Sequence, residues 1–329
     1  MGARHLFAAV LLAAAWIGSI AVDARARSAP TAIIWDDDCA SDVDCVFSLT
    51  AVHRWIDSGK VRVLAFILDS PNAYGAPVMN VWRIHYRHPS IPIGTFKGST
   101  GGTGANSDWS GAVRDAYDPG DTSARYPDCV NVYRKALASA PRRHVTIVET
   151  GFPTCLVALL KSPADRISPL SGAQLAKTKV RALFVMGGDY PGPTTEFNFQ
   201  NAPADNAYLF RIWRRQNGFP PVYLNGFAPG SGVITGAPRD LEADHPAHIA
   251  EAVAKTTARP SWDLLSLFQG IFGIHAFTIS GDGTNDVDPA SGRNSWNPMP
   301  ASGHYFLTLS RPPAFYQSLL ASDGKRETR

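Results

Sequence analysis

Five aspartates lie within nine positions directly after a short apolar run, and they are the clearest candidates for chemistry in this sequence. They are Asp36, Asp37, Asp38, Asp42 and Asp44. Like charges at this spacing repel one another, so a folded chain needs a cation or bound protons to keep them together. Packed carboxylate oxygens suit Ca2+, and a carboxylate beside such an ion can accept a proton from metal-bound water.

A purely structural role is the alternative interpretation of these aspartates. Asp42 or Asp44 would lie near the N-terminus of a helix expected over residues 45–59, where a carboxylate interacts well with the helix dipole. One capping aspartate is enough for that role. The number of aspartates therefore favours a metal or catalytic site.

Short apolar runs that alternate with helical patterns predict an α/β fold, with an open, mainly parallel sheet flanked by helices. Strands are expected over 31–35, 61–68, 91–96, 144–150, 180–188 and 220–227, and helices over 45–59, 76–88, 129–140, 153–162, 204–216 and 261–273. Residues 97–127 are predicted to be a long surface loop, and residues 295–310 a C-terminal β-hairpin. Because no segment has the composition of a linker, residues 28–329 are expected to form a single domain.

Polar side chains follow several of these predicted strands. The aspartates follow the first strand, Asn72 the second, and Thr154, Glu196 and Asn198 later ones. Open parallel sheets bind ligands beyond the carboxyl ends of their strands. We therefore expect these residues to converge on one pocket.

The N-terminal segment has the parts of a secretory signal. Arg4 and His5 precede an apolar run over residues 6–22, and small residues follow it, so cleavage is expected to remove residues 1–27. An uncleaved membrane anchor is the alternative. The mature protein is expected to be secreted or periplasmic, without stable membrane association. The net charge of +3 and the lack of a Lys or Arg run argue against nucleic-acid binding.

Four cysteines are compatible with disulfides in an exported protein. Cys39, Cys45, Cys129 and Cys155 allow three pairings, among which the sequence does not choose. Four buried free thiols are the alternative, because free cysteine is often buried.

At this point the sequence resembles a known family, the inosine–uridine-preferring nucleoside hydrolases. The resemblance covers most of the mature chain and is carried by five segments in matching order: DDDCASDVDC, SPNAYGAPVMN, VTIVETGFPTCLVALL, VMGGDYPGPTTEFNFQNAPADNA and SWDLL. The first is similar to the family's aspartate motif D-x-D-x-x-x-D-x-D-D. The resemblance implies an open-sheet α/β fold, one bound Ca2+, and hydrolysis of the N-glycosidic bond of ribonucleosides, which would be small-molecule partners. It also implies a homo-oligomer.

The resemblance assigns roles to residues of this chain. Asp38 would be the general base on the attacking water. Asp36 and Asp263 would be metal ligands, together with the carbonyl group of Thr154. The substrate would be bound by Asp44, Asn72, Glu196, Asn198 and Trp262, with the Trp262 indole stacking on the leaving base.

One departure from the family motif affects the metal site. Its last aspartate, a metal ligand, is Cys45 here, and a soft sulfur ligand is a poor substitute for a carboxylate around Ca2+. Asp42 is the residue that would then reach the ion. Because Cys155 immediately follows Thr154, a disulfide between Cys45 and Cys155 is expected beside or in place of the metal site.

Two other function classes compete with a nucleoside hydrolase. A non-catalytic homologue that binds nucleosides or sugars, with a degraded metal site, is favoured by Cys45 and by Ala202, which stands where the family has an aspartate. Retention of the other motif residues favours the hydrolase. A phosphatase with an aspartate nucleophile would need a threonine or valine after the second aspartate and a later strand-end lysine, and neither is evident.

Overall fold

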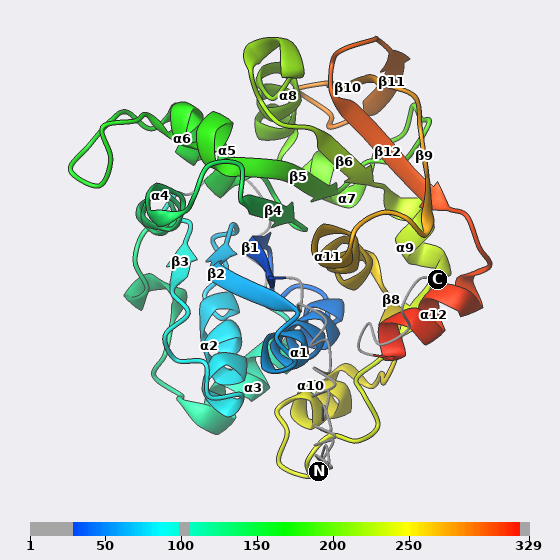
Figure 1. Cartoon of the computed structure of the whole chain (residues 1–329). Coiled ribbons are helices and arrows are strands. Elements are labelled where there is room, and N and C mark those ends of the chain that lie inside the picture. The colour runs from blue at the N-terminus through cyan, green and yellow to red at the C-terminus, as the bar shows by residue number, and fades with distance from the viewer. Residues whose placement is uncertain (1–28, 99–105, 323–329) are drawn as a thin grey trace, which may run out of the picture.

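A single ten-stranded sheet forms the centre of the computed structural model, which describes residues 29–98 and 106–322 (Figure 1). The strands follow the order β11-β10-β12-β6-β5-β4-β1-β2-β3, and β9 pairs with β12. Their bounds are β1 Thr31–Asp37, β2 Val61–Leu68, β3 Ile93–Thr95, β4 Val145–Glu149, β5 Val180–Met186, β6 Val222–Asn225, β9 Phe277–Ile279, β10 Gly283–Val287, β11 Asn294–Pro298 and β12 His304–Leu309. All strands from β3 to β12 along this order pair in parallel. The predicted fold class is confirmed.

Helices cover both faces of this sheet (Figure 1). One face packs against α1 Asp44–Asp57, α2 Gly75–His85 and α11 Trp262–Phe272, and the other against α4 Cys129–Ser139, α5 Thr154–Lys161, α6 Gly172–Lys179 and α8 Pro203–Ile212. Two buried clusters result, because alternate residues of a strand point to opposite faces. Ile33 and Trp35 of β1 enter the first cluster, and Ile34 enters the second. α11 packs along β1, with the start of β1 at the C-terminal part of the helix, so the N-terminus of α11 lies near the end of β1.

The remaining elements connect or extend these layers. They are α3 Asp108–Tyr117, α7 Phe197–Asn201, α9 Phe227–Gly232, α10 Ala247–Ala254 and α12 Pro313–Ala321, with 3-10 helices over Ser123–Arg125 and Arg215–Asn217. A separate two-stranded sheet joins β7 Ile234–Thr235 and β8 Arg259–Pro260. None of the helices within the described ranges is both long and apolar enough to cross a lipid bilayer. The predicted signal peptide, residues 1–27, lies outside the described residues.

Two local predictions are wrong. The predicted loop 97–127 contains α3, whose Trp109 and Val113 are buried against neighbouring helices, a pattern hidden by the glycine-rich stretch before it. A C-terminal hairpin exists, but it joins β10 to β11 and does not span the predicted residues 295–310, because β11 does not pair with β12. β12 instead lies between β10 and β6, parallel to β6. The short separation of β11 and β12 in the sequence suggested that they pair, but they are not neighbours in the sheet.

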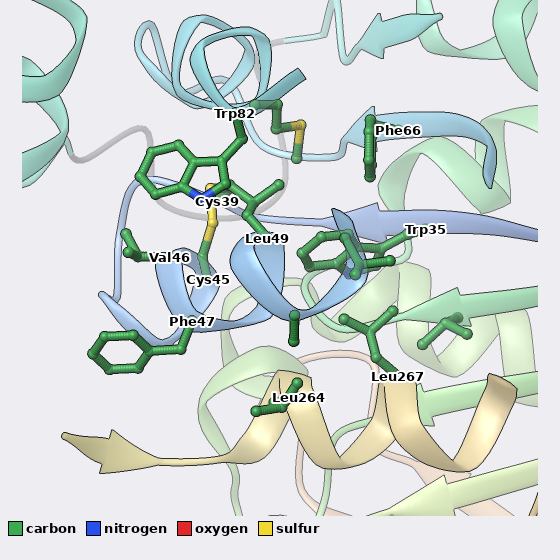
Figure 2. Close-up of a cluster of buried hydrophobic side chains, with 14 of the residues drawn as sticks. Trp35, Cys39, Cys45, Val46, Phe47, Leu49, Phe66, Trp82, Leu264 and Leu267 are labelled. Atoms are coloured by element: carbon green, nitrogen blue, oxygen red, sulfur yellow. A yellow bond between two sulfur atoms is a disulfide. The ribbon is translucent and has the colours of Figure 1, made fainter. Parts of the chain in front are cut away.

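The disulfide expected between Cys45 and Cys155 is also wrong. The structure joins Cys39 to Cys45 and Cys129 to Cys155. Cys45 belongs to the core cluster on the α1 face of the sheet, which also contains Trp82 (Figure 2), whereas Cys155 belongs to the core cluster on the opposite face. The sheet itself separates the two sulfur atoms that the motif alignment suggested were neighbours.

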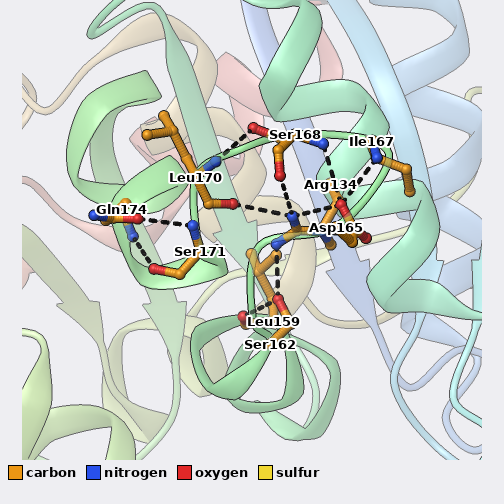
Figure 3. A network of polar contacts seen from close by, with 9 residues as sticks. All are labelled: Arg134, Leu159, Ser162, Asp165, Ile167, Ser168, Leu170, Ser171 and Gln174. Atoms are coloured by element: carbon orange, nitrogen blue, oxygen red, sulfur yellow. Dashed lines mark hydrogen bonds and ion pairs between the residues drawn. The ribbon is translucent and has the colours of Figure 1, made fainter.

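Arg134 organises a buried polar network on the α4 side of the sheet (Figure 3). Its guanidinium donates to both carboxylate oxygens of Asp165, at 2.9 and 2.7 Å, and to Ser162 Oγ at 3.0 Å. It also donates to the carbonyl oxygens of Ser168 and Leu170. One side chain thus satisfies the backbone of the segment between α5 and α6.

Histidines gather where α1, α2 and the segment before α10 meet. The His53 ring lies nearly parallel to the rings of Tyr86 and His88, with centroids 5.1 and 5.0 Å away, and its Nδ1 is 2.7 Å from that of His88. The Nε2 of His245 lies 3.0 Å from the Tyr86 hydroxyl, and its ring packs against His85 at 4.6 Å. Burial, and then the charge of the neighbouring histidines, lowers the pKa of His53 well below its ordinary value and that of His245 to about 4.

Acidification from pH 6.5 to about 4 is expected to remove a stabilising contribution of this cluster. The folded-state pKa of His245 lies below its ordinary value of 6.5, so the unfolded chain binds more protons in this interval. The contribution is therefore present above pH 6.5 and is lost as the pH falls. Urea unfolding midpoints measured against pH should fall less steeply for His245→Asn than for the wild type. Parallel curves for the two proteins would contradict this assignment.

Candidate functional site

A pocket of about 630 Å3 lies beyond the carboxyl ends of the central strands. Its lining residues come from the loop after β1, the ends of β4 and β5, the starts of α1, α7, α9 and α11, the segment before α3, and β8. They are Asp38, Cys39, Ser41, Asp42, Asp44, Cys45, Asn106, Ser107, Thr150, Met186, Glu196, Phe197, Asn198, Phe227, Arg259, Trp262 and Asp263. Seven of the ten predicted site residues therefore meet here: Asp38, Asp42, Asp44, Glu196, Asn198, Trp262 and Asp263.

The acidic loop, residues 38–44, forms one wall of this pocket. Asp38 accepts a hydrogen bond from Ser41 Oγ at 3.0 Å, and Ser107 Oγ donates to the carbonyl oxygens of Ala40 and Ser41. Ala40 has a φ of 91°, a conformation that glycine adopts more easily. These contacts hold the loop in a tight turn between β1 and α1.

A close approach of the chain after β4 supports the same loop. A Cβ atom at Gly151 would lie 2.5 Å from the backbone nitrogen of Asp38 and 2.6 Å from a carboxylate oxygen of Asp69. No real Cβ contact is that short, so only glycine allows this approach. The backbone nitrogen of Phe152 then donates to Asp69 at 3.0 Å.

Asp42 is held by an arginine from the far end of the chain. Arg259, on β8, donates to both carboxylate oxygens of Asp42, with distances of 2.6 Å from Nη2 and 2.9 Å from Nε. This bidentate pair supplies the charge that neutralises Asp42. The ligand role predicted for Asp42 therefore competes with an existing ion pair.

The other carboxylates at the site have no such partner: Asp37, Asp44 and Asp263 are buried, and Asp38 is half-buried. Burial raises the pKa of Asp37 to about 6, and burial together with the charge of Asp37 raises that of Asp38 to about 8. Burial also raises the pKa of Asp44 and Asp263 well above the ordinary value; the charge of Asp42 adds to the rise at Asp44, and the charge of Asp44 adds to the rise at Asp263. In each case the surroundings disfavour the charged carboxylate, and a bound cation would reverse that effect.

Unpaired oxygens at the strand ends agree with a cation-binding role. Among the described residues, Asp36 Oδ1, Asp37 Oδ1, Asp69 Oδ1 and Glu149 Oε2 are buried and have no hydrogen-bond partner. The second oxygen of Asp36 accepts from the Tyr133 hydroxyl at 2.7 Å. Hard oxygen donors of this kind fit a hard metal ion better than a soft one.

The carboxylates do not yet form a closed metal cage. Within the described part of the chain, only one set of three candidate ligand atoms lies within 4.8 Å of one another, and it belongs to Asp37, Cys39 and Cys45. The two sulfur atoms of this set are bonded to each other in the disulfide. A hard ion would therefore be held by the pocket carboxylates Asp38, Asp44 and Asp263. It would have to draw them closer together.

Glu196 and Asn198 line another side of the pocket, and both present hydrogen-bond acceptors. Glu196 accepts from the backbone nitrogens of Gly188 at 2.9 Å and of Asn198 at 3.1 Å, and caps α7. The Asn198 side-chain nitrogen donates to the carbonyl oxygens of Thr150 and Met186. These bonds fix both side chains and leave the Asn198 Oδ1 to accept from a ligand.

Three predicted site residues are not among the lining residues. Asp36 is buried on β1, the Asn72 side-chain oxygen accepts from the backbone nitrogens of Tyr74 and Gly75, and the Thr154 hydroxyl donates to the carbonyl oxygen of Asp69. Their bonds shape the strand ends behind the pocket. Contact with a ligand remains a prediction for these residues.

Aromatic side chains form the outer wall of the pocket. The Trp262 ring stacks on Phe227 with centroids 5.4 Å apart, and its Nε1 donates to the Phe227 carbonyl oxygen at 3.0 Å. Phe227 is 44% exposed and Phe197 is also exposed. The structure thus places Trp262 at the pocket and not under the sheet, beside surfaces on which a flat ring can stack.

Sequence reasoning missed several lining residues. Phe227 ends a predicted strand, a position that could have drawn attention to it. Asn106 and Ser107 follow a glycine-rich stretch, and Arg259 lies 217 residues from its partner Asp42. No local pattern connects residues so far apart.

Comparison with known proteins places this geometry in context. No family profile and no curated protein sequence matches the chain. Solved structures that resemble it include a plant nucleoside hydrolase, PpNRh1 (16% identity, 91% of this chain and 100% of that chain, TM-score 0.59). An inosine–uridine-preferring nucleoside hydrolase from Bacillus anthracis gives 14% identity, 89% and 99% coverage, and a TM-score of 0.61.

A third similar structure is that of a bacterial effector. The type III effector protein XopQ, solved in complex with adenosine diphosphate ribose, gives 16% identity, 91% and 94% coverage, and a TM-score of 0.68. At these identities the likeness concerns the fold. The prediction drawn from the aspartate motif is confirmed at this level: the chain has the α/β fold of the nucleoside hydrolases.

Proposed function

We propose that this protein hydrolyses the N-glycosidic bond of ribonucleosides with the help of one bound Ca2+. The observation that carries the proposal is the convergence of Asp38, Asp44 and Asp263 in a pocket that also has a hydrogen-bonding side and an aromatic wall. Such a pocket offers a place for a cation, a sugar and a flat base together. The chain's similarity in fold to nucleoside hydrolases supports the same assignment.

The reaction divides among the pocket residues. Bound Ca2+ would neutralise the carboxylates and acidify a water molecule. Asp38, oriented by Ser41, would take the proton from the attacking water. Breaking the C–N bond leaves positive charge on the sugar ring, and the carboxylates of Asp44 and Asp263 would stabilise it. The departing base would keep the electron pair of that bond and take a proton from water in the pocket, which balances the proton that Asp38 accepts.

Substrate recognition follows from the other two walls. Glu196 and Asn198 are fixed by backbone hydrogen bonds and would bind ribose hydroxyls. A site built to bind a hydroxyl strongly rejects an analogue without it, so ribonucleosides should be preferred to deoxyribonucleosides. Trp262 and Phe227 would stack on the base.

Trp262→Ala is expected to raise KM for nucleosides by about tenfold, because stacking on an aromatic ring contributes about 1–3 kcal/mol per base. kcat should change much less, since the indole is not in contact with the breaking bond in this account. Steady-state kinetics with a purine nucleoside test this. Phe272→Ala, on the same helix but outside the pocket, is the control for helix packing. An unchanged KM for Trp262→Ala would contradict the stacking role.

A non-catalytic binding protein is the second candidate function. It is favoured by the disulfide at Cys45, which removes the position where the aspartate motif has a further ligand. A reducing-sugar assay across a panel of nucleosides separates the two candidates. Release of ribose supports the hydrolase, whereas nucleoside or ADP-ribose binding in a calorimeter without ribose release supports the binding protein.

Export from the cell is proposed with this function. Two disulfides within the described part of the chain agree with an oxidising compartment. Fractionation of the producing cells would show whether the mature protein leaves the cytoplasm.

A further inference from the structure

The Cys39–Cys45 disulfide is part of the pocket wall. Both cysteines are among the lining residues, although they are only 1% and 2% exposed, so this disulfide lies directly behind the pocket surface. The Cys129–Cys155 disulfide lies on the other face of the sheet and is not among the lining residues. The first disulfide is therefore the one that adjoins the pocket, and the second does not.

A buried carboxylate lies beside the two sulfur atoms. A carboxylate oxygen of Asp37 and the sulfur atoms of Cys39 and Cys45 all lie within 4.8 Å of one another. Asp37 is fully buried; its Oδ2 accepts from Thr150 Oγ1 at 2.6 Å, and its Oδ1 has no hydrogen-bond partner among the described residues. A buried oxygen without a partner is costly, and a bound ion would satisfy it.

We propose that reduction of Cys39–Cys45 creates a binding site for a thiophilic divalent metal ion such as Zn2+, with Cys39, Cys45 and Asp37 as ligands. Two molecules of a thiol reductant convert the disulfide to two protein thiols and are themselves oxidised to one disulfide. The metal ion then displaces one proton from each thiol and binds two thiolates. Two sulfur ligands and one carboxylate leave one position of a tetrahedral zinc site for water from the pocket.

The chemistry of the donors explains why the redox state would change the metal. With the disulfide closed, the pocket offers only oxygen ligands and suits a hard ion. With the disulfide open, two thiolates favour a softer ion, for which they are the preferred ligands. The inference does not depend on nucleoside hydrolysis, because it concerns metal binding alone.

Co2+ is the probe for the test, because a thiolate ligand gives it a charge-transfer absorption band that an oxygen ligand does not. The full mature chain carrying Cys129→Ala and Cys155→Ala is reduced with a phosphine, freed of reductant without air, and titrated with Co2+. The expected result is a thiolate–cobalt band that saturates at one ion per chain and disappears on addition of Zn2+. The non-reduced protein should show no band.

The matched control carries Cys39→Ala and Cys45→Ala, so that reduction frees only the other pair. It should show no band after the same treatment. Asp37→Asn, in the first background, should weaken Co2+ binding by about tenfold or more while keeping the band. If loss of Cys129–Cys155 unfolds the chain, reduced wild type is compared with the reduced control. A reduced, folded protein without the band, or a band that survives in the control, would overturn the proposal.

Discussion

Asp38→Asn is expected to lower the rate of ribose release by about 10^2–10^4-fold, the usual contribution of a general base. The amide has nearly the shape of the carboxyl group but cannot accept the proton of the attacking water. Ser41 Oγ, 3.0 Å away, holds the side chain in the pocket, so the substitution should change chemistry and leave geometry intact. kcat from a reducing-sugar assay is the measurement.

The unfolding temperature of Asp38→Asn distinguishes a loss of catalysis from a loss of structure. Burial and the charge of Asp37 raise the pKa of Asp38 to about 8, so an ion-free protein gains nothing from a charge at this position at neutral pH. Asp38→Asn should therefore unfold at a temperature equal to or above that of the wild type when the metal ion is absent. Asp115→Asn, on exposed α3, is the control and should retain the wild-type rate. A fully active, stable Asp38→Asn protein would remove Asp38 from the base role.

Arg134→Met is expected to lower the free energy of unfolding by about 2–4 kcal/mol, because the buried carbonyl oxygen of Ser168 and the partly buried groups of Ser162 and Leu170 would lose their donor. The Arg134 side chain is 1% exposed and binds Asp165, Ser162 and two backbone carbonyl oxygens (Figure 3). Methionine fills similar space but donates no hydrogen bond. Urea unfolding followed by tryptophan fluorescence measures the change.

The matched control is an arginine in a solvent-exposed ion pair. Arg214, 25% exposed, lies 3.2 Å from Asp286, and exposed pairs contribute about 0–1 kcal/mol. Arg214→Met should therefore change the free energy of unfolding far less than Arg134→Met. Equal decreases in the free energy of unfolding for both variants would show that the contribution of Arg134 to stability does not depend on its burial.

The central sheet and part of the site were predictable because their signals are local. Continuous apolar runs mark β1, β2, β4 and β5 as strands buried on both faces, and the residue after each run must lie at the carboxyl edge. Asp38, Glu196 and Asn198 were placed in this way. Asp263 follows no strand, and only the resemblance to a known family drew attention to it.

Long-range contacts were not predictable from local patterns. The pairing of Asp42 with Arg259 joins positions 217 residues apart, and nothing near either residue indicates the other. The disulfides depend on which face of the sheet each cysteine occupies, and the sheet separates Cys45 from Cys155. The position of β12 beside β6 likewise depends on the whole sheet.

Turnover of a nucleoside during a calcium titration tests the central claim most directly. The purified mature protein, with its disulfides intact, is stripped of metal with a chelator, and release of the free base from inosine or uridine is followed as Ca2+ is added. The account predicts no release in the stripped protein and a rate that saturates when about one ion is bound per chain. Release that is unaffected by chelation, or no release at any Ca2+ concentration, would contradict it.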